Sequence, residues 1–131
     1  MQETMTGLAA KDVMATIAVR DLAAARNFYE RTLGLTPTET REATVAGYRC
    51  GHSTLLVYQS AFAGTNRATA ATWPVGGDIA AIVRSLKDKG VVFEHYDMPG
   101  MKHEGDLHVS GSMKAAWFKD PDGNILGLVT G

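Results

Sequence analysis

The residues best suited to metal binding or proton transfer gather in one polar segment in the second half of the chain. The segment holds three histidines and four acidic residues: Glu94, His95, Asp97, His103, Glu104, Asp106 and His108. Imidazole and carboxylate groups are ligands for divalent ions such as Zn, Mn, Ni and Fe. No two of the histidines have the i, i+4 spacing of a helical metal site, however. Two interpretations are therefore open: a metal site in an unusual place, or a solvated polar loop.

A second candidate is Cys50, the single cysteine of the chain. A catalytic cysteine needs a partner that stabilises its thiolate form. His52 is near in sequence, but a predicted turn at Gly51 and His52 carries the imidazole to the tip of a hairpin. The sequence therefore favours a small buried core cysteine over a nucleophile.

Several acidic residues lie where structural roles are expected. Asp120 and Asp122 resemble part of a calcium loop, but the pattern is too short and lacks the glutamate at its twelfth position. Proline and glycine in the same stretch predict a tight turn instead. Asp21 and Asp78 precede helical patterns and are predicted to cap those helices.

Aromatic, thioether and hydroxyl side chains on predicted strands are the candidates for a ligand pocket. They are Met14, Thr16, Tyr48, Tyr58, Trp73, Phe93 and Trp117. Side chains alternate between the two faces of a strand, so some of these must face a cleft while others pack as core under the helices. We expect Tyr48, Trp73 and Trp117 to be the strongest pocket candidates, because buried Tyr and Trp need a polar partner for one atom.

The elements that position these side chains occur twice. The matched positions are Ala15 and Ala71, Asp21 and Asp78, and Gly34 and Gly90. The offsets are 56, 57 and 56 residues. Each copy predicts the order strand, helix, strand, strand, strand. A duplicated module of this kind places a cleft where its two halves meet.

The whole chain, residues 1–131, is expected to form a single domain. Module one spans about residues 12–60, a linker spans 61–69, and module two spans about 70–131. Module two contains an insertion at 96–113, with proline, glycine and methionine residues. A loop of this length is commonly functional or disordered. A lid over the cleft, a contact in a dimer and an exposed irregular loop are all consistent with its composition.

Composition excludes several classes of function. Thirteen basic and fourteen acidic residues give a net charge of -1, which lacks the basic excess of a nucleic-acid-binding protein. No apolar run approaches the length of a membrane span, and the first ten residues do not resemble a signal peptide. One cysteine excludes an intrachain disulfide. We therefore expect a cytoplasmic protein that binds neither nucleic acid nor membrane.

Two stretches resemble one known family. "ATIAVRDLAAARNFYERTLGL" is similar to the first strand and helix of the vicinal oxygen chelate superfamily, and "AAWFKDPDGNILGLV" to its last hairpin. The superfamily contains glyoxalases, extradiol dioxygenases, fosfomycin-resistance enzymes and bleomycin-resistance proteins. The resemblance covers about Val13 to Val129. It implies an α+β fold of two βαβββ modules, with paired sheets around a concave cleft, commonly in a homodimer.

Enzymes of this superfamily usually hold a divalent metal on the concave sheet face, and the resemblance places its ligands at four positions. The first falls on Met14 and the last on Gly127; the other two fall near residues 69–71 and on the strand 54–59. None of these places holds a histidine or a carboxylate. A thioether and a hydrogen atom are not ligands for a hard or borderline divalent ion. The resemblance therefore implies the fold but predicts no metal at this site.

Three functions follow as hypotheses. The first is a metal-free protein, similar to bleomycin-resistance proteins, that binds a partly apolar or aromatic small molecule in its cleft without a cofactor. Bleomycin is cationic, so its binder would be expected to have acidic walls, which a balanced charge does not indicate. The second is a lyase or dioxygenase with a relocated divalent metal. The third is an enzyme that uses a tyrosine or histidine as acid or base without metal. A homodimer is expected, because open edge strands favour pairing.

Overall fold

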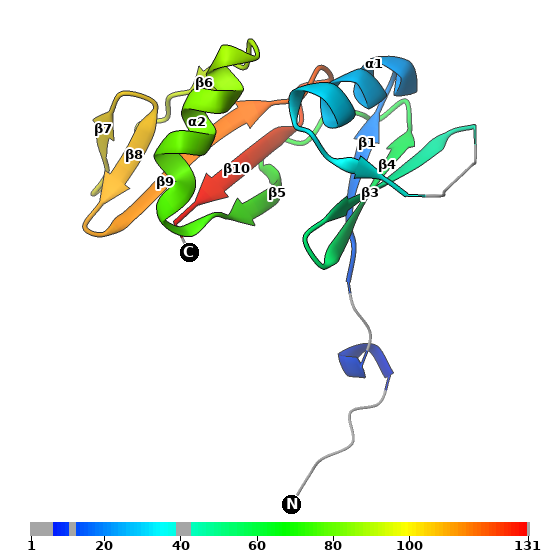
Figure 1. Ribbon diagram of the computed structural model, residues 1–131, viewed down its shortest axis with the longest axis horizontal. Helices are drawn as coiled ribbons and strands as arrows, with labels where there is room; N and C mark the ends of the chain where they lie inside the picture. The colour runs from blue at the N-terminus through cyan, green and yellow to red at the C-terminus, as the bar shows by residue number, and fades with distance from the viewer. Residues whose placement is uncertain (1–6, 11–12, 39–42, 131) are drawn as a thin grey trace, which may run out of the picture.

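Two β-sheets lie side by side in the structure, and each is covered on one face by a helix (Figure 1). This computed structural model describes residues 7–10, 13–38 and 43–130. The sequence pattern predicts the second strand of module one over residues 35–40. The end of that strand, the predicted start of module one at residue 12 and the last residue of the chain lie outside the described ranges. The sheets correspond to the two repeats, which confirms the predicted α+β fold with two βαβββ modules.

Module one is a four-stranded sheet with the strand order β1-β4-β3-β2. Its strands are β1 (Ala15–Val19), β2 (Thr36–Pro37), β3 (Val45–Cys50) and β4 (Ser53–Gln59). The helix after β1 consists of α1 (Leu22–Arg26) and a π-helical continuation, η2 (Asn27–Thr32). Asp21 caps it as predicted, because its carboxylate accepts hydrogen bonds from the N–H groups of Ala23 and Ala24 at 3.0 and 3.2 Å. A short helical turn, η1 (Gly7–Ala10), precedes the module.

Module two repeats this plan with a larger sheet, ordered β5-β10-β9-β8-β7. Its strands are β5 (Thr69–Pro74), β6 (Phe93–Glu94), β7 (Lys102–Glu104), β8 (Leu107–Ser110), β9 (Met113–Lys119) and β10 (Ile125–Val129). The helix α2 (Ile79–Asp88) follows a one-turn helix, η3 (Gly76–Asp78), and covers the sheet with Ile79, Val83 and Leu86. The first strand of each module pairs in parallel with the last, β1 with β4 and β5 with β10.

Two local predictions were wrong. Asp78 makes no capping hydrogen bond with its side chain, because it belongs to the turn η3 rather than preceding the helix in an extended conformation. The insertion at 96–113 was expected to be a loop, yet it forms the hairpin β7–β8, which pairs with β9 and widens the sheet. Gly105 turns this hairpin with a φ of 62°, a conformation that favours glycine.

Alternation along the strands separates a core face from an open face. On β1, Ile17 and Val19 are buried under the helix of module one, while Thr16 on the opposite face is exposed. Val57 on β4 pairs with Ile17 and shares the core face. One hydrophobic core runs through both modules, so the two sheets and their helices form a single folded unit.

The two modules meet along a seam at which β1 and β5 are the neighbouring edges. At one end of the seam, the turn between β9 and β10 reaches module one. The Asn124 side chain donates a hydrogen bond to the Ala18 carbonyl oxygen at 2.7 Å, and the Tyr29 hydroxyl donates one to Asp120 at 2.9 Å. The linker packs here as well, with Ala63 fully buried. No helix in the described part of the chain has the length and apolar composition to cross a membrane.

Candidate functional site

A cavity lies at the other end of the seam, where β1 begins. Its volume is about 710 Å³, within the range of small-molecule sites. Its wall is formed by Val13, Ala15, Gly34, Leu35, Arg49, Cys50, Gly51, Ser53, Thr54, Leu55, Ala71, Thr72, Trp73 and Pro74. Both modules contribute, through the start of β1, the β3–β4 hairpin and the end of β5. We call this space the seam cavity.

The wall of the seam cavity is largely apolar, with a few polar groups. The indole of Trp73 provides a flat aromatic surface, and the half-buried ring also packs against the core. Hydroxyl groups come from Ser53, Thr54 and Thr72, and one charged group comes from Arg49. Apolar walls with a small number of polar groups are typical of ligand sites, in which the polar groups fix orientation. The seam cavity therefore suits a small molecule with a flat apolar body.

Cys50 also lines the seam cavity, but its chemistry is that of a core residue. Burial raises the pKa of its thiol, and a hydrogen bond from the Trp73 side chain offsets only part of that increase. His52 is exposed in the turn beyond the strand. A thiol that stays protonated, without a base beside it, is a poor nucleophile. The structure therefore agrees with the structural interpretation of Cys50.

Two of the predicted pocket residues lie in the core instead. Tyr48 is 1% exposed, stacks on Tyr29 with ring centroids 5.9 Å apart, and donates a hydrogen bond to Glu30 at 2.9 Å. Phe93 is 7% exposed and packs edge-to-face against Phe118. The expectation that they face a cleft was wrong, because the alternation pattern gives two faces but does not say which one lies under the helix.

The other predicted residues divide between three places. Trp73 lies in the wall of the seam cavity. Met14, Thr16 and Tyr58 are on or beside the open face of module one and are exposed, so the structure does not bring them to Trp73. Trp117 lies on the open face of module two, beside a histidine. The seven candidates therefore do not form one site.

The residues that the sequence reasoning missed are the polar ones of the seam cavity. Arg49 follows Tyr48 directly in β3, so the alternation that buries the tyrosine turns the arginine to the other face. Thr54 is its partner across the hairpin. In the sequence, this site is indicated only by a cation and hydroxyl residues on the two sides of a predicted two-residue turn. Residue type alone favoured the aromatic candidates instead.

The positions at which the resemblance places metal ligands do not fit a metal ion. A Cβ atom at Gly127 would lie 3.1 Å from Nε1 of Trp117 and 3.3 Å from Oγ1 of Thr72. The Trp117 indole therefore occupies the space that the side chain of a ligating glutamate would need at this position. Met14, the first ligand position, is half exposed and offers only a thioether. These donors do not suit the divalent ions of the superfamily, and the space beside Gly127 is already filled.

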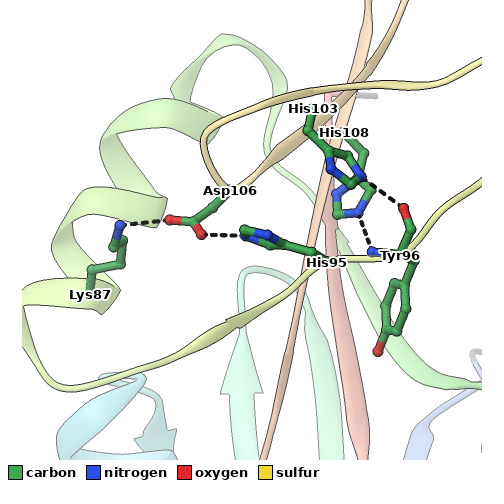
Figure 2. Close-up of polar contacts among 6 residues, drawn as sticks. All are labelled: Lys87, His95, Tyr96, His103, Asp106 and His108. Carbon is green, nitrogen blue, oxygen red and sulfur yellow. Dashed lines mark hydrogen bonds and ion pairs between the residues drawn. The ribbon is translucent and has the colours of Figure 1, made fainter.

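The histidines of the insertion form a cluster in which Nε2 of each ring has a backbone partner (Figure 2). His103 and His108 are paired across β7 and β8, with ring centroids 4.7 Å apart. Nε2 of His103 contacts the carbonyl oxygen of Tyr96 at 2.8 Å, while the Tyr96 N–H donates to Nε2 of His108 at 2.9 Å. Two histidines therefore hold the backbone of one residue, just beyond the end of β6.

A second set of contacts in Figure 2 ties the same hairpin to α2. Asp106 contacts Nζ of Lys87 at 2.7 Å and Nε2 of His95 at 2.8 Å. The hydrogen bonds from Lys87 and then from His95 hold the pKa of Asp106 below its usual value. These contacts anchor the hairpin to the helix, and no residue of 96–113 lines the seam cavity.

This arrangement favours a structural role for the histidine cluster. His108 is fully buried, and burial, followed by the neighbouring His103, lowers its pKa, so its ring is held neutral. Its Nε2 accepts from Tyr96 and is therefore engaged. Among the described residues, no group of three or more His, Cys, Asp or Glu side chains is placed to hold a metal ion. The interpretation as a relocated metal site has no geometric support.

In sequence profile and in structure, the chain is similar to proteins of one superfamily. The sequence profile of the Glyoxalase/Bleomycin resistance protein/Dioxygenase superfamily matches residues 12–128. A bleomycin resistance determinant encoded on transposon Tn5 is similar in structure, with a TM-score of 0.68, 20% identity, and coverage of 91% of this chain and 96% of that chain. A lactoylglutathione lyase from Agrobacterium tumefaciens has a TM-score of 0.67 and 16% identity, with coverage of 92% of each chain.

A fosfomycin resistance protein from Listeria monocytogenes is similar as well, with a TM-score of 0.63, 13% identity, and coverage of 98% of this chain and 93% of that chain. No curated protein sequence matches this chain significantly. At these identities the similarities show the fold, which proteins with different activities share.

Proposed function

The chain belongs to the glyoxalase/bleomycin resistance protein/dioxygenase superfamily, and from that membership we propose that it binds a small, partly apolar or aromatic molecule in the seam cavity without a metal ion. The observation that carries the proposal is the cavity itself, about 710 Å³, lined by both modules and floored by the indole of Trp73. The altered metal positions support it, because Gly127 and Met14 supply no ligand and Trp117 covers the space beside Gly127.

The proposal differs from the activity of several relatives. A lyase or dioxygenase of this superfamily needs charged or imidazole ligands on the open sheet face, and this chain has none at the four positions. Among the described residues, no group of three or more His, Cys, Asp or Glu side chains is placed to replace them. Sequestration or sensing of a ligand requires a binding cavity but neither a metal nor a nucleophile. The seam cavity provides such a space.

A fluorescent probe tests the proposal directly. N-phenyl-1-naphthylamine is neutral and aromatic, and its emission rises in an apolar site. We expect it to bind the full chain at one site per protomer, before and after treatment with EDTA. Trp73→Leu is expected to weaken binding about tenfold by removing the flat surface. Trp117→Leu serves as the matched control and should leave the affinity unchanged.

Metal analysis completes the experiment. We expect elemental analysis to find no stoichiometric metal in the purified chain. Absence of probe binding, or binding that responds to Trp117→Leu and not to Trp73→Leu, contradicts the seam cavity as the site. Stoichiometric metal on the open sheet face, together with metal-dependent turnover of hydroxyacid thioesters, overturns the metal-free proposal.

One observation favours a second candidate, an enzyme that uses acid or base groups without metal. The Tyr96 hydroxyl is buried and makes no hydrogen bond among the described residues. Burial raises its pKa, so the phenol remains a proton donor through the neutral range. Turnover of a panel of α-keto compounds that is lost in Tyr96→Phe would establish this function. The absence of turnover leaves ligand binding as the function.

A homodimer and a cytoplasmic location are further parts of the proposal. Proteins of this superfamily often form dimers. Val13 is 91% exposed, and Met14 and Tyr58 are exposed on or beside the open face of module one, so apolar surface is available for a second copy. Light scattering of the full chain tests this, and a monomer at micromolar concentration contradicts it.

A further inference from the structure

The charges around the seam cavity are not balanced. The chain has nearly equal numbers of acidic and basic residues, with a net charge of -1. Among the described residues of the cavity wall, however, no aspartate or glutamate occurs, and the single charged side chain is Arg49. The described part of the cavity wall therefore carries a positive group and no acidic counterpart.

The guanidinium of Arg49 is also unengaged in the described part of the structure. The ion pairs found there are Lys87 with Asp106, His95 with Asp106, and Lys119 with Glu94, and none involves Arg49. Its cross-strand neighbours are Thr36 and Thr54, which are uncharged. Arginine presents several N–H donors in a rigid plane that matches the oxygens of a carboxylate, sulfonate or phosphate. Because the Arg49 guanidinium has no ion-pair partner there, it is available to bind an anionic ligand.

Hydroxyl groups line the cavity together with Arg49. Thr54 lies opposite Arg49 across the β3–β4 hairpin, and Thr72 on β5 lines the wall contributed by module two. Hydroxyl groups donate hydrogen bonds to anions as readily as they accept from other groups. On the same cavity wall, Trp73 provides the flat apolar surface. The cavity thus combines an anion-binding side with an aromatic side.

We infer that the ligand of the seam cavity is an amphiphilic anion, with a flat apolar body that lies against Trp73 and a carboxylate, sulfonate or phosphate group that pairs with Arg49. This inference rests on the proposed function and narrows its ligand class. It also distinguishes the chain from proteins that bind a cationic molecule, because a cation bound beside Arg49 would be repelled.

Two probes that share an aromatic body and differ in charge test the inference. 1-Anilinonaphthalene-8-sulfonate has the N-phenylnaphthylamine skeleton with one added sulfonate, and N-phenyl-1-naphthylamine lacks that group. Both are titrated into the full chain and into Arg49→Gln. Arg84→Gln is the matched control, since Arg84 is exposed on α2, outside the cavity wall, and its substitution changes the net charge equally. Thermal melts verify that each variant is folded.

We expect Arg49→Gln to weaken binding of the sulfonate probe at least tenfold, the change that loss of one charge-assisted contact produces. Binding of the neutral probe should stay within twofold, and Arg84→Gln should affect neither probe. Inorganic salt should weaken the sulfonate probe alone, because screening acts on the charged contact.

The remaining outcomes distinguish a failure of the anion inference from a failure of the proposed function. Equal loss of both probes in Arg49→Gln, or no loss of either, overturns the anion inference while the neutral probe still supports a ligand cavity. An equal effect of Arg84→Gln assigns the result to net charge and also overturns the inference. Failure of both probes to bind the unmodified chain overturns the proposed function itself.

Discussion

Two turns occupy equivalent places in the repeated modules, yet they act differently on the seam. The turn between β9 and β10 has five residues, Asp120–Asn124, and it hydrogen-bonds to module one. The turn between β3 and β4 has two residues, Gly51 and His52, and the hairpin beside it lines the seam cavity. The first turn closes one end of the seam, and the second leaves the other end open.

The closed end is held by a buried carboxylate whose hydrogen-bonding capacity is fully used. Asp120 accepts from the Tyr29 hydroxyl, from the N–H groups of Asp122 and Asn124, and from the Asn124 side chain, at 2.8 to 3.0 Å. A buried polar group costs stability only when its partners are missing. At the open end the polar groups of Arg49 and Thr72 line the seam cavity. The buried hydrogen bonds and the proposed ligand site therefore lie at opposite ends of one interface.

The largest expected effect comes from opening the closed end. Asp120→Ala removes the acceptor for four donors and should lower the free energy of unfolding by about 3–5 kcal/mol. Asp122→Ala is the matched control in the same turn. Its carboxylate accepts from the exposed N–H of Arg20 at 3.0 Å, so a loss of about 0.5–1 kcal/mol is expected. Urea unfolding measures both values, and equal losses would contradict a special role for Asp120.

The linker should be almost as sensitive where it meets the same turn. Gly64 has a φ of 71°, and a Cβ there would lie 2.0 Å from the carbonyl oxygen of Asp122. Gly64→Ala therefore combines backbone strain with a clash against backbone and should cost about 3 kcal/mol. Gly111→Ala isolates the strain, because Gly111 has a φ of 61° and open space around its Cβ. Its expected cost is about 1 kcal/mol, and a larger cost at Gly111 would be evidence against the packing of the linker.

Alkaline pH should lower the free energy of unfolding, because Tyr29 at the closed end of the seam stays protonated in the native state. Burial, with the Asp120 carboxylate beside it, raises the pKa of Tyr29 far above its usual value. Above about pH 10 the unfolded chain loses this proton and the native state keeps it. The native state then binds more protons, so the free energy of unfolding falls as pH rises.

Tyr29→Phe should make that decline shallower by about 0.7 kcal/mol per pH unit on average around the ordinary tyrosine pKa, and by about 1.4 kcal/mol per unit well above it. Denaturant unfolding between pH 9 and 11 measures the slope (about one unit either side of the ordinary tyrosine pKa). Tyr58→Phe is the control, since Tyr58 is 38% exposed on the open face of module one. An unchanged slope in Tyr29→Phe would mean that the hydroxyl is not protected from ionisation in the native state.

The smallest change in stability is expected at the open end. Cys50 is half buried beside the seam cavity, and its thiol contacts the Trp73 indole. Cys50→Ala should cost about 1 kcal/mol or less, because a small side chain next to an existing cavity loses few contacts. The same unfolding series measures it. A loss as large as that of Asp120→Ala would show that both ends of the seam hold the modules together.

The sequence predicted the repeated modules, the hairpins and the capping role of Asp21 because these depend on neighbouring residues. Local spacing defines the strands, and proline and glycine define the turns. The same reasoning failed at Asp78 and at the insertion. In each case the outcome depends on a neighbouring element: the turn η3 leaves Asp78 at the N-cap position without a side-chain hydrogen bond, and β9 offers an edge on which β7–β8 folds.

The candidate site was only partly predictable for a similar reason. Trp73 was identified from its residue type, but Tyr48 and Phe93 were assigned to the wrong face, and Arg49 was missed. Alternation determines that neighbouring residues face opposite ways, while the side covered by a helix is fixed by packing. Which strand ends surround a cavity depends on how the two sheets meet, and no local pattern contains that information.

By itself, the sequence determined a duplicated fold and the loss of the usual metal ligands, because a repeat and a missing side chain are properties of the chain alone. Tertiary structure decided which end of the seam is closed. The bonds that close it join residues 91 to 106 positions apart, such as Tyr29 with Asp120 and Ala18 with Asn124. Their formation depends on the packing of two sheets, and the same packing leaves Arg49 and Trp73 around an open cavity.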